Sequence, residues 1–263
     1  LCESAIVGAA LGLSIKGRKA IMEMQFADFA TVGFNQIVNN LAKLHYRWNE
    51  NADVVIRMPT GAGVGAGPFH SQSNEAWFFH TPGLKIVYPS SPEDAKGLIT
   101  AAIEDPNPVM FFEHKALYRS ITGSVPEEYY NTEIGKANLI NEGEQVSIIT
   151  YGMGVHWAKE AINKLKINAD LLDLRTLLPL DKEAIFRSVN KTGRAIILHE
   201  DSITGGIGGE IAALINENCF ENLDAPVLRC ASIDTPVPFA ADLEKSFLAN
   251  NQLEEKLLNL LDY

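Results

Sequence analysis

Three absences limit what this protein can be. Its three cysteines, Cys2, Cys219 and Cys230, are odd in number and widely spaced, so they form neither a disulfide framework nor a CxxC metal motif, and a reducing compartment is expected. No apolar stretch approaches the roughly 20 residues that a membrane span needs. No run of lysine and arginine occurs, and 22 basic against 33 acidic residues give a formal charge of -11. We therefore expect a soluble chain that binds neither membrane nor nucleic acid.

The sequence has enough apolar residues for two hydrophobic cores. It has 263 residues, 46% of them hydrophobic, and a domain usually has about 100 to 200 residues. Short apolar runs have the length and continuity of strands buried on both faces, and helical patterns alternate with them. The expected strands are 19–24, 53–58, 84–88, 109–113, 146–151, 169–174, 195–199 and 227–230; the later expected helices are 154–166, 181–190 and 208–217.

The periodicity is lost between His114 and Glu144, where serine, proline, asparagine and glycine gather. This composition is typical of a linker with at most one short element. We therefore predict an α/β protein of two domains, each with a largely parallel sheet flanked by helices. The predicted boundaries are 1–122 for the first domain, 123–143 for the linker and 144–263 for the second domain.

A glycine-rich segment follows the second expected strand. Residues 61–66 formally satisfy the dinucleotide-binding fingerprint, with Ala66 in last place,. Pro68 argues against that interpretation, because a helix should open at once to direct its N-terminus at the pyrophosphate. A flexible loop that shapes a cleft is favoured instead. His70 after this loop and His199 at a strand end stand where α/β domains present chemistry.

Five short motifs follow one another in the first half of the chain, and three more continue through the second. They are Glu3-Ser-Ala-Ile-Val-Gly8, Gln25-Phe-Ala-Asp-Phe29, Pro68-Phe-His-Ser-Gln-Ser73, Pro82-Gly-Leu-Lys85, Glu113-His-Lys-Ala-Leu-Tyr-Arg119, Asp173-Leu-Arg-Thr176, His199-Glu-Asp201 and Asp234-Thr-Pro236. Together they resemble the beta subunit of thiamine-diphosphate-dependent 2-oxo acid dehydrogenases. The resemblance covers essentially the whole chain and implies a transketolase-like pyrimidine-binding domain followed by a transketolase C-terminal-type domain.

The resemblance assigns roles to three residues. Glu3 matches the glutamate that hydrogen-bonds a ring nitrogen of the cofactor's aminopyrimidine, which favours the tautomer that removes the proton from the thiazolium carbon. Without the resemblance, an acid at the head of a helix would be read as a capping or dipole-matching residue. Phe29 matches the aromatic residue that stacks on the pyrimidine. His70 matches the histidine facing the reacting carbon, with a role in acyl transfer to a lipoyl group.

The resemblance also implies cofactors and partners. Ala102, Asp105 and Asn107 match a segment that surrounds a structural potassium ion in relatives, although a plain helix end explains these residues nearly as well. The diphosphate and magnesium are held in this family by a Gly-Asp-Gly motif on an alpha subunit, and this sequence contains no such motif. We therefore expect an alpha-type partner, two alpha and two beta chains, and docking to a lipoyl acyltransferase core.

The resemblance also bears on the substrate, the upstream segment and the compartment. The local sequences around His70 and Phe112 resemble those of branched-chain (2-oxoisovalerate) enzymes more than those of pyruvate dehydrogenase, which stays an alternative. Relatives carry several tens of residues before the position of Glu3, so an upstream segment is expected. If its absence displaces Glu3, the chain is a non-catalytic assembly or docking subunit. The expected compartment is the cytoplasm for a bacterial source and the mitochondrial matrix for a eukaryotic one.

Overall fold

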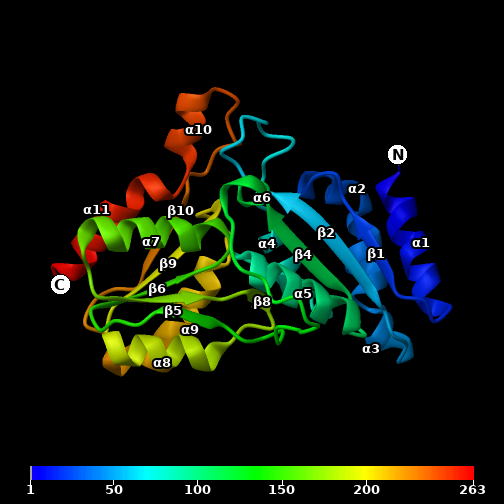
Figure 1. Cartoon of the computed structure of the whole chain (residues 1–263), viewed down its shortest axis with the longest axis horizontal. Helices are drawn as coiled ribbons and strands as arrows, with labels where there is room; N and C mark the ends of the chain where they lie inside the picture. The colour runs from blue at the N-terminus through cyan, green and yellow to red at the C-terminus, as the bar shows by residue number, and fades with distance from the viewer. Residues whose placement is uncertain (1) are drawn as a thin grey trace.

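The computed structural model, which describes residues 2–263, contains two five-stranded sheets with helices on their faces, one built mainly from each half of the chain (Figure 1). The first half contains, in order, α1 (Glu3–Ile15), β1 (Ala20–Glu23), η1 (Ala27–Phe29), α2 (Ala30–Asn35), the π-helical turn η2 (Gln36–Leu41), α3 (Leu44–Trp48), β2 (Val54–Thr60), α4 (Ala76–Phe79), β3 (Lys85–Val87), α5 (Pro92–Glu104), β4 (Val109–His114) and α6 (Leu117–Ser120).

The second half begins with a short strand inside the expected linker. Its elements are β5 (Asn138–Asn141), β6 (Val146–Thr150), α7 (Met153–Leu165), β7 (Ala169–Asp173), β8 (Thr176–Leu178), α8 (Lys182–Thr192), β9 (Ala195–Ser202), α9 (Gly208–Cys219), η3 (Phe220–Asn222), β10 (Leu228–Ser232), α10 (Ala241–Phe247) and α11 (Asn250–Leu261). Among the helices described here, none is both long and apolar enough to cross a bilayer.

The two sheets are largely parallel, which confirms the predicted fold class. The first has the order β1-β2-β4-β3-β8 and the second the order β10-β9-β6-β7-β5. In each, one edge strand is antiparallel: β8 beside β3, and β5 beside β7. The strand β8 comes from the second half of the chain but completes the sheet of the first half. The sequence pattern did not predict this exchange.

Local sequence explains why these elements form where they do. Every residue of β6 and β7 is buried, as expected for parallel strands with helices on both faces. Helix α5 begins with Ser91 as its N-cap, whose Oγ accepts a hydrogen bond from Asp94 N at 3.2 Å, and Pro92 occupies the first turn,. The helical pattern around Ile37 and Leu41 is present, but it is divided between α2, η2 and α3.

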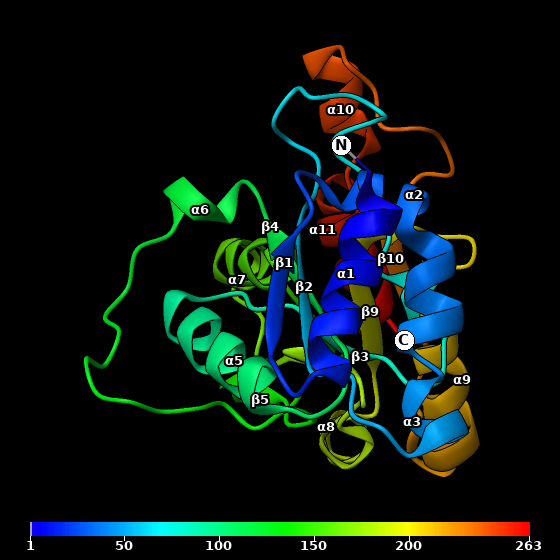
Figure 2. The ribbon, with the colours of Figure 1, turned by 90° about the vertical axis from the view of Figure 1, so that its right-hand side faces the viewer.

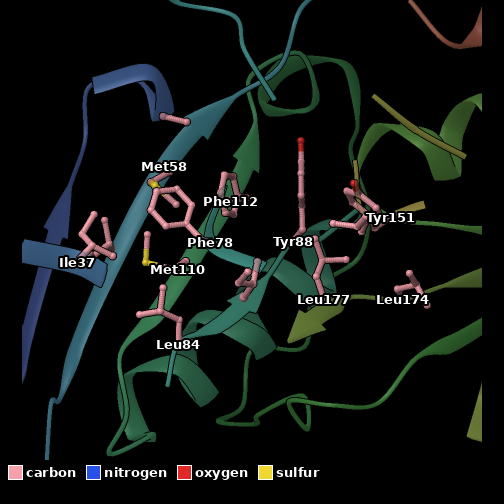
Figure 3. Close-up of a cluster of buried hydrophobic side chains, with 14 of the residues drawn as sticks. Ile37, Met58, Phe78, Leu84, Tyr88, Met110, Phe112, Tyr151, Leu174 and Leu177 are labelled. Carbon is pink, nitrogen blue, oxygen red and sulfur yellow. The ribbon is translucent and has the colours of Figure 1, made fainter. Parts of the chain in front are cut away.

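The main hydrophobic core runs across the boundary between the halves (Figure 3). The ring of Tyr88 stacks on Phe112, with ring centroids 5.7 Å apart, and its other neighbour is Tyr151 of the second half, at 5.3 Å. Leu174 and Leu177 continue the same cluster. The two halves therefore share one core, and the interface is stabilised by burial of apolar and aromatic side chains.

Buried carboxylates lie beside this shared core. Glu200, at the end of β9, accepts hydrogen bonds at Oε1 from Ala62 N (2.6 Å) and Ser73 Oγ (3.2 Å), and its Oε2 lies 2.7 Å from His114 Nε2. Burial opposes ionisation of Glu200, but His114 and these donors lower its pKa below the usual range,. Glu200 is therefore a buried, charged contact between the two halves.

Glu75 is a second carboxylate at the interface, and its pKa is shifted in the opposite direction to that of Glu200. It is fully buried, and its Oε1 accepts a hydrogen bond from Tyr151 Oη at 2.5 Å. Burial, followed by the charge of Asp201, raises the pKa of Glu75 to about 8. Burial also raises the pKa of Asp201. At neutral pH the folded protein therefore keeps Glu75 protonated.

Gly83 packs so closely on another segment that a side chain is excluded. Its φ is 99°, and a Cβ atom would lie 1.9 Å from the carbonyl oxygen of Ala42. We expect Gly83→Ala to destabilise the fold by ~3 kcal/mol or more. Gly17→Ala is the matched control, since Gly17 also has positive φ but no atom within 4 Å, and its expected cost is about 1 to 2 kcal/mol. Urea unfolding followed by circular dichroism measures both; equal midpoints would contradict the steric argument.

Replacement of Glu75 should change how stability depends on pH. The unfolded state loses this proton near pH 4.5, while the folded state keeps it until about pH 8. The native protein therefore loses stability as the pH rises through this window. Glu75→Gln cannot ionise, so its melting temperature relative to the native chain should rise between pH 5 and pH 8, by roughly several degrees. Glu127→Gln, at an exposed glutamate, is the control; parallel melting curves for Glu75→Gln and native protein would refute the assignment.

Candidate active site

Glu3 and Phe29 lie at the starts of two helices, α1 and α2, that pack on each other. Glu3 opens α1 and is half-buried, and Phe29 immediately precedes α2. The two helices approach closely because Gly33 of α2 faces the first turns of α1: a Cβ atom there would lie 3.2 Å from Val7 Cγ2 and 3.5 Å from the Glu3 carbonyl oxygen. Glu3, whose carboxylate is predicted to face the cofactor, therefore begins a helix, α1, that packs directly on α2, the helix that follows Phe29.

Phe29 and His70 meet in an aromatic cluster with Phe26. The ring centroids of Phe29 and His70 are 5.6 Å apart, those of Phe26 and His70 are 4.8 Å apart, and all three pairs are edge-to-face. This geometry suits rings whose positive edges meet negative faces. Two of the residues singled out from the sequence are thus in direct contact, although 41 positions separate them in the chain.

Polar groups surround the aromatic cluster. Asp28 Oδ1 accepts hydrogen bonds from Gln72 Nε2 (2.8 Å) and Gln72 N (3.3 Å), while its buried Oδ2 and the buried Ser71 Oγ have no protein partner among residues 2–263. Buried polar atoms without partners are unfavourable unless a ligand or water meets them. An aromatic surface with nearby unpaired oxygens fits one face of a polar heteroaromatic ring, such as an aminopyrimidine.

Lys115 places a positive charge beside the aromatic cluster. Its Nζ donates to the Gly61 carbonyl oxygen at 2.7 Å and lies 5.6 Å from the centre of the Phe26 ring. Burial lowers the pKa of Lys115 to about 8, although Asp28, Glu200 and Glu244 act in the opposite direction. The sequence analysis assigned no role to Phe26, Asp28 or Lys115. Phe26, Asp28 and Lys115 lie inside motifs that carried the resemblance, and this was the only signal for them.

The glycine-rich segment is held by the chain's own carboxylates. Gly63 N donates to Glu244 Oε1 at 2.9 Å and Gly65 N to Glu244 Oε2 at 3.1 Å. The amides that would meet a pyrophosphate in a dinucleotide site are thus directed at an internal anion, in agreement with the argument from Pro68. The expected flexible loop is instead tied by several hydrogen bonds.

The residues matched to potassium lie together at the end of α5. Ala102 is buried in the helix, and Asp105 is its C-cap. The carboxylate of Asp105 forms an ion pair with Lys85, and its Oδ1 accepts from Asn107 N and Asn107 Nδ2, both at 2.9 Å. The side-chain oxygens of Asp105 are therefore already occupied. Potassium at this place stays a prediction.

His199 lies away from the aromatic cluster. It is 1% exposed, neither ring nitrogen has a protein partner within residues 2–263, and burial lowers its pKa to about 4. Gly206 and Gly208 pack against the ring so closely that a Cβ atom on either would overlap it. His199 is thus a neutral, enclosed side chain beneath the turn into α9, not a group presented in a cleft.

The described part of the chain contains no group of three or more His, Cys, Asp or Glu side chains arranged to hold a metal ion. The contacts of Glu3 and Phe29 with a pyrimidine ring, and the chain that holds magnesium and a diphosphate, stay predictions.

Comparisons with known proteins agree along the whole chain. The transketolase pyrimidine-binding domain matches residues 1–120, and the transketolase C-terminal domain matches residues 135–252. The chain is 46% identical to the 2-oxoisovalerate dehydrogenase subunit beta of Bacillus subtilis, over 100% of this chain and 83% of the relative. It is 46% identical to subunit beta 2 of the mitochondrial 2-oxoisovalerate dehydrogenase of Arabidopsis thaliana, over 90% of this chain and 68% of the relative.

Two further relatives extend the comparison. The pyruvate dehydrogenase E1 component subunit beta of Bacillus subtilis is 43% identical over 96% of this chain and 79% of its own length. Among solved structures, a split-gene transketolase described as an inactive beta4 tetramer matches with a TM-score of 0.80 and 25% identity, over 100% of this chain and 82% of that chain. The chain therefore belongs to the family of 2-oxo acid dehydrogenase beta subunits, built from a transketolase-type pyrimidine-binding domain and a transketolase-type C-terminal domain.

Proposed function

We propose that this chain is the beta subunit of an enzyme that oxidatively decarboxylates a branched-chain 2-oxo acid and transfers the acyl group to a lipoyl group. The observation that carries the proposal is the edge-to-face contact between Phe29 and His70, next to helix α1, which begins at Glu3 and packs on α2 at Gly33. Relatives named 2-oxoisovalerate dehydrogenase at 46% identity favour the branched-chain substrate over pyruvate, whose relative is 43% identical.

Thiamine diphosphate supplies a nucleophilic thiazolium carbon when it is bound. Glu3, the half-buried first residue of α1, would accept or share a proton at a ring nitrogen of the cofactor's aminopyrimidine,. Phe29 would provide the ring face against which the pyrimidine rests. Both roles need a rigid support, which the close packing of α1 on α2 at Gly33 supplies.

His70 would act on the acyl-transfer half of the reaction. Phe26 and Phe29 hold its ring edge-on from two sides, so its orientation is restricted while it remains half-exposed. An imidazole ring can donate a proton at one nitrogen and accept one at the other. In this position it would orient the lipoyl sulfur or move a proton to it.

The rest of the active site would come from an alpha-type chain. That partner would hold the diphosphate and magnesium, since the Gly-Asp-Gly motif that holds them in the family does not occur in this sequence. Two alpha and two beta chains would place each cofactor at an alpha-beta interface, and the assembly would dock to a lipoyl acyltransferase core. The compartment would be the cytoplasm in a bacterium or the mitochondrial matrix in a eukaryote; one relative is from the bacterium Bacillus subtilis, and the Arabidopsis relative is named mitochondrial. A potassium ion near Ala102, Asp105 and Asn107 would be structural and would depend on backbone oxygens, because Lys85 already neutralises Asp105.

Activity should appear only when the chain is assembled with an alpha-type chain from the same source. We expect thiamine-diphosphate-dependent decarboxylation of 2-oxoisovalerate by the pair and none by this chain alone. The preference over pyruvate should be about tenfold or more in kcat/KM, because the two acids differ by two methyl groups in a pocket. A higher kcat/KM for pyruvate would identify a pyruvate enzyme, and inactivity of a correctly assembled pair would identify a docking subunit.

Glu3→Gln should separate catalysis from assembly. A glutamine keeps the shape of the side chain but cannot share a proton in the same way, so we expect kcat of the assembled pair to fall by about 100-fold or more. Glu50→Gln, at an exposed glutamate after α3, is the control and should retain native kcat. Full activity in Glu3→Gln would show that Glu3 is only a helix-capping acid.

A further inference from the structure

In the glycine-rich loop, Gly61–Gly67, the backbone amides of Gly63 and Gly65 form a nest for a side chain from the other half of the chain. Gly61, Gly63, Gly65 and Gly67 all have positive φ, at 98°, 83°, 69° and 71°, and the residues between them do not. Alternation of this kind turns successive N–H groups toward a common point and favours an anion there. The anion is the carboxylate of Glu244, which lies 181 positions beyond Gly63 in the chain.

The carboxylate of Glu244 accepts hydrogen bonds from two backbone amides. Its Oε1 accepts from Gly63 N at 2.9 Å, and Gly65 N donates to both oxygens, at 3.3 Å and 3.1 Å. The side chain is only 5% exposed. Hydrogen bonds from amides to a charged acceptor are stronger than neutral ones, and more so where water is excluded. Lys115, which donates to Gly61 O, adds a compensating positive charge nearby.

The segment that carries Glu244, here called the arm (residues 237–248), lies beside the loop (Figure 1 and Figure 2). In both views the loop, in cyan, runs beside α10, in orange-red. Val237 and Phe247 bury Ala62 in a small hydrophobic cluster. The ring of Phe239 lies against Gly67, where a Cβ atom would come within 2.3 Å of it. The loop is therefore held at its start, middle and end.

The end of this loop leads directly to His70. His70 lies three residues after Gly67, and its backbone N–H donates to the Gly67 carbonyl oxygen at 3.4 Å. Beyond it, Gln72 is fixed by Asp28 and Ser73 by Glu200. His70 has no side-chain hydrogen bond of its own among those found within residues 2–263, so its position depends on the two phenylalanine rings and on its backbone supports.

We propose that Glu244 is a positioning residue for the reaction: its carboxylate fixes the Gly61–Gly67 loop and, through it, places His70 against Phe26 and Phe29. This role rests on the proposed function, because it assigns Glu244 to the step in which His70 takes part. Glu244 does not touch the aromatic cluster itself and acts through the backbone.

The first experiment measures the tether without any activity. Backbone amide exchange of residues 61–72 is followed by mass spectrometry in the full chain. Glu244→Ala and Glu244→Asp remove or shorten the acceptor, so these amides should exchange about tenfold faster or more. Glu244→Gln keeps a carbonyl oxygen for Gly63 N and Gly65 N and should stay close to native. Asp242→Ala, at an exposed acid of the same helix, is the control. Native exchange in both Glu244→Ala and Glu244→Asp would overturn the tether.

The second experiment asks whether the tether acts through His70 in the assembled alpha-beta pair. We expect Glu244→Ala to lower kcat for acyl transfer to a lipoylated domain by about 10- to 100-fold, with a much smaller change in KM for the 2-oxo acid. Glu244→Gln should restore most of this loss. In a His70→Ala background, Glu244→Ala should cost no more than about twofold, since coupled residues are not additive.

The outcomes separate the two proposals. Faster exchange with native kcat, or losses that multiply in the double variant, would overturn the positioning role while leaving the proposed function intact. An assembled native pair that lacks 2-oxo acid activity would overturn the proposed function, and positioning for this reaction with it. The exchange measurement would still decide whether Glu244 holds the loop.

Discussion

The carboxylate of Glu200 is the contact on which the joined molecule depends. It leaves the end of β9 in the second half and binds Ala62, Ser73 and His114 of the first half. A buried charge is unfavourable unless donors surround it, and removal of one partner leaves the others uncompensated. The position of the second half is thus coupled to the two ends of the loop that contains His70. Burial of the shared core around Tyr88 and Tyr151 stabilises the contact between the two halves. The hydrogen bonds of Glu200 fix how the two halves are positioned relative to each other.

Most of the fold could be predicted from the sequence because its strands are parallel and buried on both faces. Such strands are continuous apolar runs, and the runs at 146–151 and 169–174 correspond closely to β6 and β7. The exchanged strand β8 could not be predicted, since three residues carry too little pattern and its partner β3 lies about 90 positions away in the chain. The arm with α10 was missed for a similar reason: its buried residues face a loop and not a sheet, so neither helical nor strand periodicity marks them.

The candidate site divides in the same way. Glu3, Phe29 and His70 were predicted from short motifs of consecutive residues. The structure brings Phe29 and His70 into contact. Their supports were not found because each is a relation between distant positions: Asp28 with Gln72, Lys115 with Gly61, and Glu244 with Gly63. The glycine pattern itself was ambiguous, because a nest for phosphate and a nest for a carboxylate of the same chain use the same residues. Only the tertiary structure distinguishes a bound ligand from an internal anion.

The strand exchange at β8 limits how the two halves can be inherited. Because Thr176–Leu178 closes the sheet of the first half beside β3, recombination that joined a foreign C-terminal domain at the linker would have to bring a compatible strand as well. A gene break at the linker would expose β3 as an unpaired edge, a surface that invites aggregation. The halves match two separate family models, yet the hydrogen bonds of β8 make them a single unit for evolution and for protein engineering.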